Sequence, residues 1–163
     1  MQKLSDKILH ILRTSARLTD AQIAAMLGVT EQEVNDEIKE LEDKGIIAGY
    51  TAIINEEKYD VNTVIAMVHL KVSPQPDKGY SAVAAKIAQF REVESVHLMS
   101  GNYDLAVTVR GGNLREVAMF VADHLAVLDG VLDTTTLFTL KRFKEHSEIF
   151  TLDEDDERGL VSP

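Results

Sequence analysis

The stretch "GVTEQEVNDEIKELEDKG", residues 28–45, has the pattern of one amphipathic helix that ends at a glycine. Thr30 and Glu33 have the spacing of a capping box, and Gly45 stands where a helix would end. The apolar residues that recur at helical spacing are Val34, Ile38 and Leu41. The basic residues of the stretch are Lys39 and Lys44, against the acidic residues Glu31, Glu33, Asp36, Glu37, Glu40, Glu42 and Asp43. The sequence therefore predicts a strongly acidic helix.

Two further helices are predicted before this one. Apolar residues recur every three or four positions over residues 4–12 and again over residues 23–27. Ser5 and Thr19 are of the residue types that begin helices, and Gly28 is suited to end one. Three short helices in succession, with a tight turn between the second and the third, are typical of a helix-turn-helix.

The pattern changes after Gly45. The segment "IIAGYTAIIN", residues 46–55, is rich in β-branched residues and predicts a strand or β-ribbon beside the helices. We therefore expect a winged helix-turn-helix over residues 1–58. The polar segment at about residues 55–62 is the expected linker to a second domain.

The second half of the chain alternates between strand and helix patterns. Its predicted strands are residues 63–73, 93–100, 105–111 and 131–143, and its predicted helices are residues 80–90 and 114–128. This βαββαβ order predicts a ferredoxin-like sandwich over residues 63–145, with both helices on one face of the sheet. The whole chain is therefore expected to be α+β.

The face of the sheet away from the helices is expected to be partly apolar. Strand alternation places Met67 and His69 on one side of the first strand, and His97 and Met99 on one side of the second. Exposed apolar patches usually mark an interface, so we expect a second copy of the chain to cover this face. The alternative is a face polar enough to remain in water.

Composition sets limits on location and chemistry. The chain contains no cysteine, which excludes disulfides and thiolate zinc sites, and its net charge of −10 argues against a nonspecific nucleic-acid coat. The first twenty residues contain no apolar run long enough for a signal peptide or membrane span, so we expect a cytoplasmic protein. Residues 146–163 are acidic and lack periodic apolar residues, which predicts a disordered tail.

Two motifs carry a resemblance to a known family. They are "LTDAQIAAMLGVTEQEVNDEIKELEDKGIIAGYTAIIN", residues 18–55, and "MSGNYDLAVTV", residues 99–109. With these motifs the chain resembles the Lrp/AsnC (feast/famine) family of transcriptional regulators. The resemblance implies a dimer built through the C-terminal domains, often assembled into an octamer, that binds double-stranded promoter DNA. It also implies an amino-acid effector held near the Gly-x-Tyr-Asp turn, at an interface between subunits.

The acidic helix has one flank that is suited to DNA. At about 100° per residue, Gln32, Asn35 and Lys39 fall on one side of the buried stripe, with Thr30 at the N-terminal end. Asn and Gln suit adenine edges, and Lys suits guanine or phosphate. The candidate phosphate contacts are Lys3, Lys7, Arg13 and Arg17. The alternative is an ordinary solvated helix that does not touch DNA.

The turn at Gly101 is the candidate effector site. Glycine permits positive φ and close approach of a ligand, and the backbone N–H groups of such a turn can hold a carboxylate. Asp104 is the expected partner of an α-ammonium group. The other expected site residues are Met99, Ser100, Asn102, Tyr103, Thr134 and Thr136. The alternative is a plain hairpin turn in which Asn102 supplies the turn conformation.

Two other functions are consistent with parts of the sequence. The acidic helix also suits an oligomeric sensor or interaction module with weak or no DNA binding of its own. Sirohaem decarboxylases resemble the same family, but they tend to carry a His-Asn-Tyr-Glu-Arg stretch where this chain has Gly101 to Asp104. The histidines lack metal-ligand spacing, and we expect no catalytic residue, metal site or cofactor.

Overall fold

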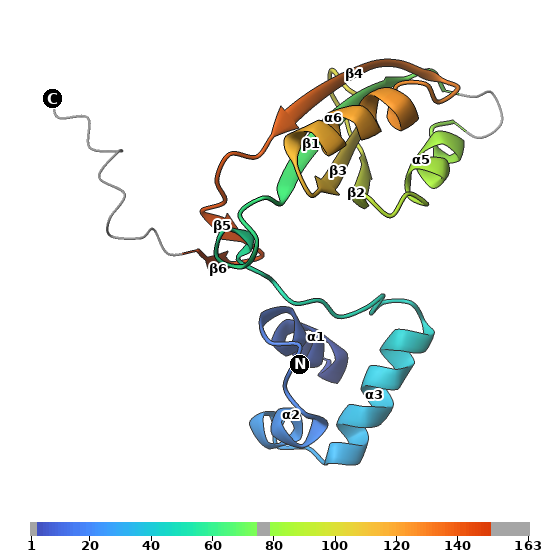
Figure 1. The fold of residues 1–163 in the computed structure, drawn as a ribbon. Coiled ribbons are helices and arrows are strands. Elements are labelled where there is room, and N and C mark those ends of the chain that lie inside the picture. The colour runs from blue at the N-terminus through green and yellow to red at the C-terminus, as the bar shows by residue number, and fades with distance from the viewer. Residues whose placement is uncertain (1–2, 75–78, 151–163) are drawn as a thin grey trace, which may run out of the picture. The chain divides into compact units, whose positions relative to one another are not determined.

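The computed structural model describes residues 3–74 and 79–150, which fall into two compact units (Figure 1). The first contains the chain up to Ile53 together with Lys144–Ile149, and the second contains Ile54–Phe143 and Phe150. Each unit has its own hydrophobic core. No helix within the described ranges is both long and apolar enough to cross a membrane.

The first unit is a head of three helices packed around four buried side chains. The helices are α1 (Leu4–Thr14), α2 (Asp20–Leu27) and α3 (Glu31–Asp43). The buried side chains are Ile8, Ile23, Ala24 and Val34, so each helix contributes to the core. The three predicted helices are therefore confirmed.

Capping boxes begin two of these helices. The Thr30 hydroxyl accepts from the Glu33 N–H at 3.2 Å, and the Glu33 carboxylate accepts from the Thr30 N–H at 2.8 Å. Thr19 and Gln22 form the same reciprocal pair at the start of α2. The predicted start at Ser5 is wrong, because this residue lies inside α1.

The strand predicted over residues 46–55 is not formed. The N–H groups of Ile46 and Ile47 both donate to the Leu41 carbonyl, at 2.9 and 3.1 Å, and so complete the end of α3. The rest of the segment is irregular. A strand requires a hydrogen-bonded neighbour, and none of the described residues forms a ladder with this segment.

The first unit instead contains a short hairpin from the other end of the chain. Strands β5 (Lys144–Glu145) and β6 (Glu148–Ile149) pair across a turn in which His146 and Ser147 have φ of 45° and 74°. The structure therefore differs from the expected disordered tail at the start of that segment. Residues 151–163, the rest of the expected tail, lie outside the described residues.

The second unit has the predicted βαββαβ order. After a short helix α4 (Glu56–Tyr59) in the expected linker, its elements are β1 (Val64–Val72), α5 (Ser81–Ile87), β2 (Val93–Leu98), β3 (Leu105–Gly111), α6 (Leu114–Phe120), a π-helical turn η1 (Val121–Leu125) and β4 (Val131–Phe138). The antiparallel sheet has the order β2-β3-β1-β4, which is that of a ferredoxin-like fold. The predicted α+β fold class is confirmed.

Two predicted elements are shorter than expected. Strand β4 ends at Phe138 rather than residue 143, and its last contact with β1 is the hydrogen bond of 2.9 Å from the Thr139 N–H to the Ile65 carbonyl. Helix α5 ends at Ile87 rather than residue 90. The N–H groups of Gln89 and Phe90 donate to carbonyls only three residues back, which tightens and ends the helix.

The register of β1 decides which side chains the helices cover. Val68 lies opposite Thr136 of β4, and the next residue, His69, lies opposite Thr135. The β1 side chains buried under α5 and α6 are Ala66, Val68, Leu70 and Val72. Met67 and His69 therefore point to the other face, as predicted.

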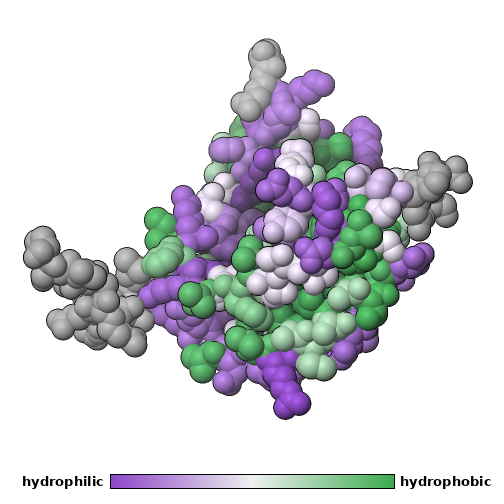
Figure 2. All heavy atoms as spheres, turned by 90° about the horizontal axis from the view of Figure 1, so that it is seen from above, coloured by the Kyte–Doolittle hydropathy of each residue, from purple (hydrophilic) through white to green (hydrophobic). Residues whose placement is uncertain are grey.

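That other face exposes large apolar side chains. Met67 lies opposite Leu137, and their side chains are 45% and 49% exposed. His97 of β2 also lies on this face, because it pairs with Ala106, the partner of His69. Figure 2 shows that hydrophobic side chains gather into continuous patches on the surface that it draws, beside hydrophilic ones. The predicted partly apolar face is confirmed.

The capping box of α3 gives a test of how the head is stabilised. We expect Thr30→Ala to lower the free energy of unfolding of the first unit by about 1 kcal/mol, because the Glu33 N–H loses its acceptor. Urea denaturation followed by helical circular dichroism measures the change. Thr14→Ala is the matched control, since the Thr14 hydroxyl only donates to a carbonyl of its own helix. Equal effects of the two substitutions would contradict the capping account.

Candidate functional sites on α3 and the Gly101 turn

The outer side of α3 presents an amide, an ammonium group and a carboxylate. Gln32 and Lys39 are both exposed, as the angular sorting predicts. The Gln32 side-chain amide donates to the Asp36 carboxylate at 2.8 Å, so Asp36 shares this surface. The less acidic flank therefore still carries negative charge beside the predicted reading residues.

Asn35 has a different environment from the one expected. It is half-buried, and its side-chain amide donates at 2.8 Å to the carboxylate of Asp20, the first residue of α2. This contact joins the two helices on either side of the turn. The Thr30 hydroxyl is likewise occupied, since it also donates to the Glu33 carboxylate at 2.7 Å. Of the four predicted reading residues, Gln32 and Lys39 are the most accessible.

The acids on the opposite flank stabilise the helix itself. Hydrogen bonds from the Thr30 N–H and hydroxyl hold the pKa of Glu33 below its usual range, so this carboxylate stays charged at the positive end of the helix dipole. Glu40 forms an ion pair with Lys44 one turn later, and this contact raises the pKa of Lys44. Much of the acidic charge on α3 thus has a local structural role.

The predicted phosphate contacts are exposed basic side chains. They are Lys3, Lys7, Arg13 and Arg17, and within residues 3–74 and 79–150 none of them forms an ion pair. Lys3 and Lys7 stand four positions apart and so share one side of the first turns of α1. Their charges are free to meet phosphates.

Tyr50 was not predicted and ties the segment after α3 back to the helix. Its hydroxyl donates to the Glu42 carboxylate at 2.8 Å. Burial, with this hydrogen bond, raises the pKa of Tyr50 to about 12, so the hydroxyl remains a donor. No local pattern indicated this contact, because the segment was expected to be a strand.

The Gly101 turn presents free backbone donors. It is closed by a hydrogen bond of 2.8 Å from the Met99 N–H to the Asp104 carbonyl, and Gly101 has a φ of 153°, where glycine is favoured. Among the described residues, none accepts a hydrogen bond from the N–H groups of Ser100, Gly101 or Asn102. The three residues are exposed, so these groups can reach a ligand.

Asp104 holds the turn against the end of β1. Its carboxylate accepts from the Val72 N–H at 2.8 Å, at the point where the pairing of β1 with β4 shifts register. The Lys71 ammonium lies 3.6 Å from the same carboxylate. The Val72 N–H and then Lys71 keep the pKa of Asp104 below its usual range. Asp104 is therefore engaged within the chain, whereas we expected it to be available to an ammonium group.

Tyr103 and Thr135 form the wall beside the turn. The Tyr103 hydroxyl lies 3.5 Å from the Thr135 hydroxyl, and its ring centroid lies 4.7 Å from that of His69. Thr134 and Thr136 pair with Leu70 and Val68, whose side chains are buried under the helices, and so they lie on the wrong face for this wall. Thr135, which stands between them in the sequence, is the threonine whose hydroxyl reaches this wall.

The two units match two family models in the order predicted. Residues 2–48 match the model described as winged helix-turn-helix DNA-binding, and residues 65–149 match the model described as the Lrp/AsnC ligand binding domain. The second match alone covers more than half of the chain.

Similar proteins span nearly the same length. The chain is 44% identical over 165 aligned residues to the uncharacterized HTH-type transcriptional regulator YugG of Bacillus subtilis, with 99% of both chains covered. It is 30% identical to the HTH-type transcriptional regulator FL11 of Pyrococcus furiosus, covering 91% of this chain and 95% of that one.

Solved structures agree with these matches. A transcriptional regulator from Neisseria meningitidis, NMB0573, solved as its L-Met complex, superposes with a TM-score of 0.71 at 26% identity, over 89% of this chain and 93% of that one. The leucine response regulatory protein LrpA of Mycobacterium tuberculosis has the same fold, with a TM-score of 0.76 at 23% identity over 91% and 98% of the two chains. The chain therefore belongs to the Lrp/AsnC family of helix-turn-helix transcriptional regulators.

Proposed function

We propose that this regulator binds duplex DNA through the Gln32 and Lys39 side of α3, and that an α-amino acid bound at the Gly101 turn controls it. The observation that carries the DNA proposal is the division of charge on α3. Glu33 and Glu40 of one flank are held in helix contacts, while Gln32 and Lys39 remain exposed on the other.

The exposed side of α3 has the chemistry to read base edges. A Gln amide suits adenine, a carboxylate such as Asp36 can accept from the cytosine amino group, and Lys39 can bind guanine or phosphate. The fixed negative charge of Asp36 lowers the affinity of a single head for DNA. We therefore propose that two heads of one oligomer bind together, which raises the apparent affinity.

The effector proposal rests on the unpaired donors of the turn. Three exposed backbone N–H groups, from Ser100 to Asn102, suit the carboxylate of an amino acid, and the Tyr103–Thr135 wall can contact its side chain. The similar regulator from Neisseria meningitidis was solved with L-Met. In a single chain the bound amino acid would be enclosed on one side only, by the Tyr103–Thr135 wall. We therefore propose that a second subunit encloses it on the other side.

A homo-oligomer is also proposed from the exposed face of the sheet. Met67 and Leu137 form a cross-strand pair on the face of the sheet away from α5 and α6, and their side chains are about half exposed. A second copy that covered this face would bury both side chains, since large apolar side chains in a regular sheet favour association. The cytoplasm, where DNA and amino acids are both available, is the proposed location.

A sensor without DNA binding remains the second candidate, because α3 carries the carboxylate of Asp36 on its outer side. The decarboxylase alternative is not proposed, since the relatives described above carry the names of transcriptional regulators. Within the described ranges no group of His, Asp and Glu side chains is arranged to hold a metal ion.

DNA binding can be tested by fluorescence anisotropy on the region upstream of the protein's own gene, with a scrambled duplex for comparison. We expect Lys39→Ala to weaken binding several-fold and to reduce the salt slope by about one, because one phosphate or base contact is lost. We expect Asp36→Asn to strengthen binding by removing a repelling charge. Lys86→Ala, an exposed lysine of α5, is the matched control. Absence of binding to either duplex at low salt would favour the sensor.

The effector site can be tested by calorimetry with L-methionine, after a thermal-shift comparison of the twenty amino acids. We expect Gly101→Val to weaken amino-acid binding at least about tenfold, because a β-branched residue disfavours the φ of 153° and moves the N–H groups. Ser100→Ala keeps every backbone donor and should bind normally. An amino-acid methyl ester, which lacks the carboxylate, should not bind. Unchanged affinity in Gly101→Val would contradict the site.

The contact between Asp104 and Val72 predicts a pH-dependent stability. Because the native pKa of Asp104 is lowered, its contribution is complete above the ordinary aspartate pKa of about 3.9 and is lost as the pH falls through the native value. We therefore expect Asp104→Asn to be less stable than the wild type at pH 7, and the difference to shrink below about pH 4. Urea denaturation at a series of pH values measures this difference. A difference that does not depend on pH would contradict the account.

A further inference from the structure

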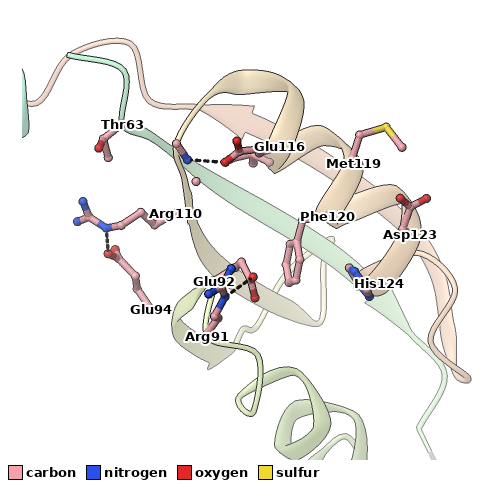
Figure 3. A pocket seen from close by; sticks show the side chains of 13 residues that line it. Thr63, Arg91, Glu92, Glu94, Arg110, Glu116, Met119, Phe120, Asp123 and His124 are labelled. Atoms are coloured by element: carbon pink, nitrogen blue, oxygen red, sulfur yellow. Dashed lines mark hydrogen bonds and ion pairs between the residues drawn. The ribbon is translucent and has the colours of Figure 1, made fainter. Parts of the chain in front are cut away.

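A pocket lies at the end of the sheet opposite to the Gly101 turn (Figure 3). Its volume is about 610 Å³, within the range of small-molecule sites. The turn joins the end of β2 to the start of β3, whereas the pocket is lined where β2 begins, at Glu92 and Glu94, and where β3 ends, at Arg110. Since β3 has 7 residues, about 20 Å separate the two places.

One wall of this pocket is aromatic and comes from α6 and η1. In Figure 3, Phe120 and His124 stand on the side of the pocket opposite Arg110. The two ring centroids are 5.4 Å apart, and Phe90 packs edge-on against Phe120 at 5.3 Å. His124 belongs to the π-helical turn, in which the Ala126 N–H donates to a carbonyl five residues back. Such turns are rare and often occur at functional sites.

The arginines in the pocket are already neutralised. Arg91 donates to Glu92 at 2.9 Å, and Arg110 donates to Glu94 (Figure 3). Glu116 is also occupied, because its two oxygens accept from the Gly112 N–H and from the side-chain amide of the helix cap. An anionic ligand would have to break one of these ion pairs before it could use a guanidinium group.

The acceptors in the pocket are not all used. Asp123 at the rim forms no hydrogen bond or ion pair with another described residue, and the arginines engage only one oxygen each of Glu92 and Glu94. The hydrogen bond from Arg91 holds the pKa of Glu92 below its usual range, so Glu92 remains a carboxylate. With four carboxylates and two guanidinium groups among the lining side chains, the pocket carries excess negative charge.

We propose that this pocket binds a small alkyldiamine. One ammonium group is held by the free oxygen of Glu92 and by the Phe120 ring, through charge-assisted hydrogen bonding and a cation–π contact. The other ammonium group reaches Asp123, and the alkyl chain lies along the apolar wall formed by α6. This site is separate from the proposed amino-acid site and does not depend on it.

Arg110 connects the pocket to the linker helix. Besides Glu94, its guanidinium donates to the Glu56 carboxylate of α4 at 2.5 Å. Glu94 lines the same pocket as Glu92, so the ammonium group held at Glu92 also attracts the Glu94 carboxylate and weakens its ion pair with Arg110. This change reaches α4 through the Arg110–Glu56 ion pair. The amide of Asp60, which closes α4 by donating to the Glu56 carbonyl at 2.7 Å, should therefore exchange with solvent at a different rate when the diamine is bound.

The test is calorimetry of the full chain with 1,5-diaminopentane at low salt. We expect one saturable site per chain, and Glu92→Gln and Asp123→Asn should each weaken binding about tenfold, since each removes one charge-assisted contact. Asp129→Asn is the matched control, because this exposed carboxylate lies outside the pocket lining and removes the same net charge. Circular dichroism confirms that each variant is folded.

Several results would overturn the proposal. They are the absence of saturable diamine binding, equal weakening by all three substitutions, and tighter binding of glutarate than of the diamine. The last result would mean that the arginines, and not the carboxylates, select the ligand. Gly101→Val should bind the diamine normally, and loss of binding in that variant would place the diamine at the turn instead.

Discussion

The alternation of side chains along β1 is the constraint on which the second unit depends. Every second residue, from Ala66 to Val72, is buried under α5 and α6, so the intervening residues must face the other way. This arrangement exposes Met67 for association and places His69 beside Tyr103. A shift of register by one residue would reverse both faces, bury the polar side chains and remove the Tyr103–Thr135 wall.

The acidic charge of α3 is consistent with DNA binding, because the net charge of a helix does not decide which side chains lie on its contact surface. Net charge sets the long-range field, which opposes approach to a polyanion, but contact depends on the side chains of one surface. In α3 the carboxylates of Glu33 and Glu40 satisfy the helix N-terminus and Lys44. The side that carries Gln32 and Lys39 combines amide, ammonium and carboxylate groups, and such a surface favours selectivity over affinity.

The two ends of the sheet have different chemistry for a physical reason. At the Gly101 turn the backbone leaves N–H donors unpaired, which suits a carboxylate. At the opposite end carboxylates outnumber guanidinium groups around an aromatic wall, which suits a cation. The second end also shares Arg110 with α4, so a ligand there would act on the helix near the start of the second unit.

The sequence by itself determined the helices of the head, the capping boxes, the βαββαβ order and the apolar open face, because each depends on periodicity or spacing within a short segment. Only the tertiary structure decided that Asn35 binds Asp20, that Asp104 binds Val72, and that Thr135 rather than its neighbours meets Tyr103. These partners lie 15 to 32 residues apart in the chain. Their contacts depend on strand register and helix packing, which local patterns do not specify. The strand expected after α3 did not form, because a strand requires a hydrogen-bonded partner and none of the described residues pairs with this segment.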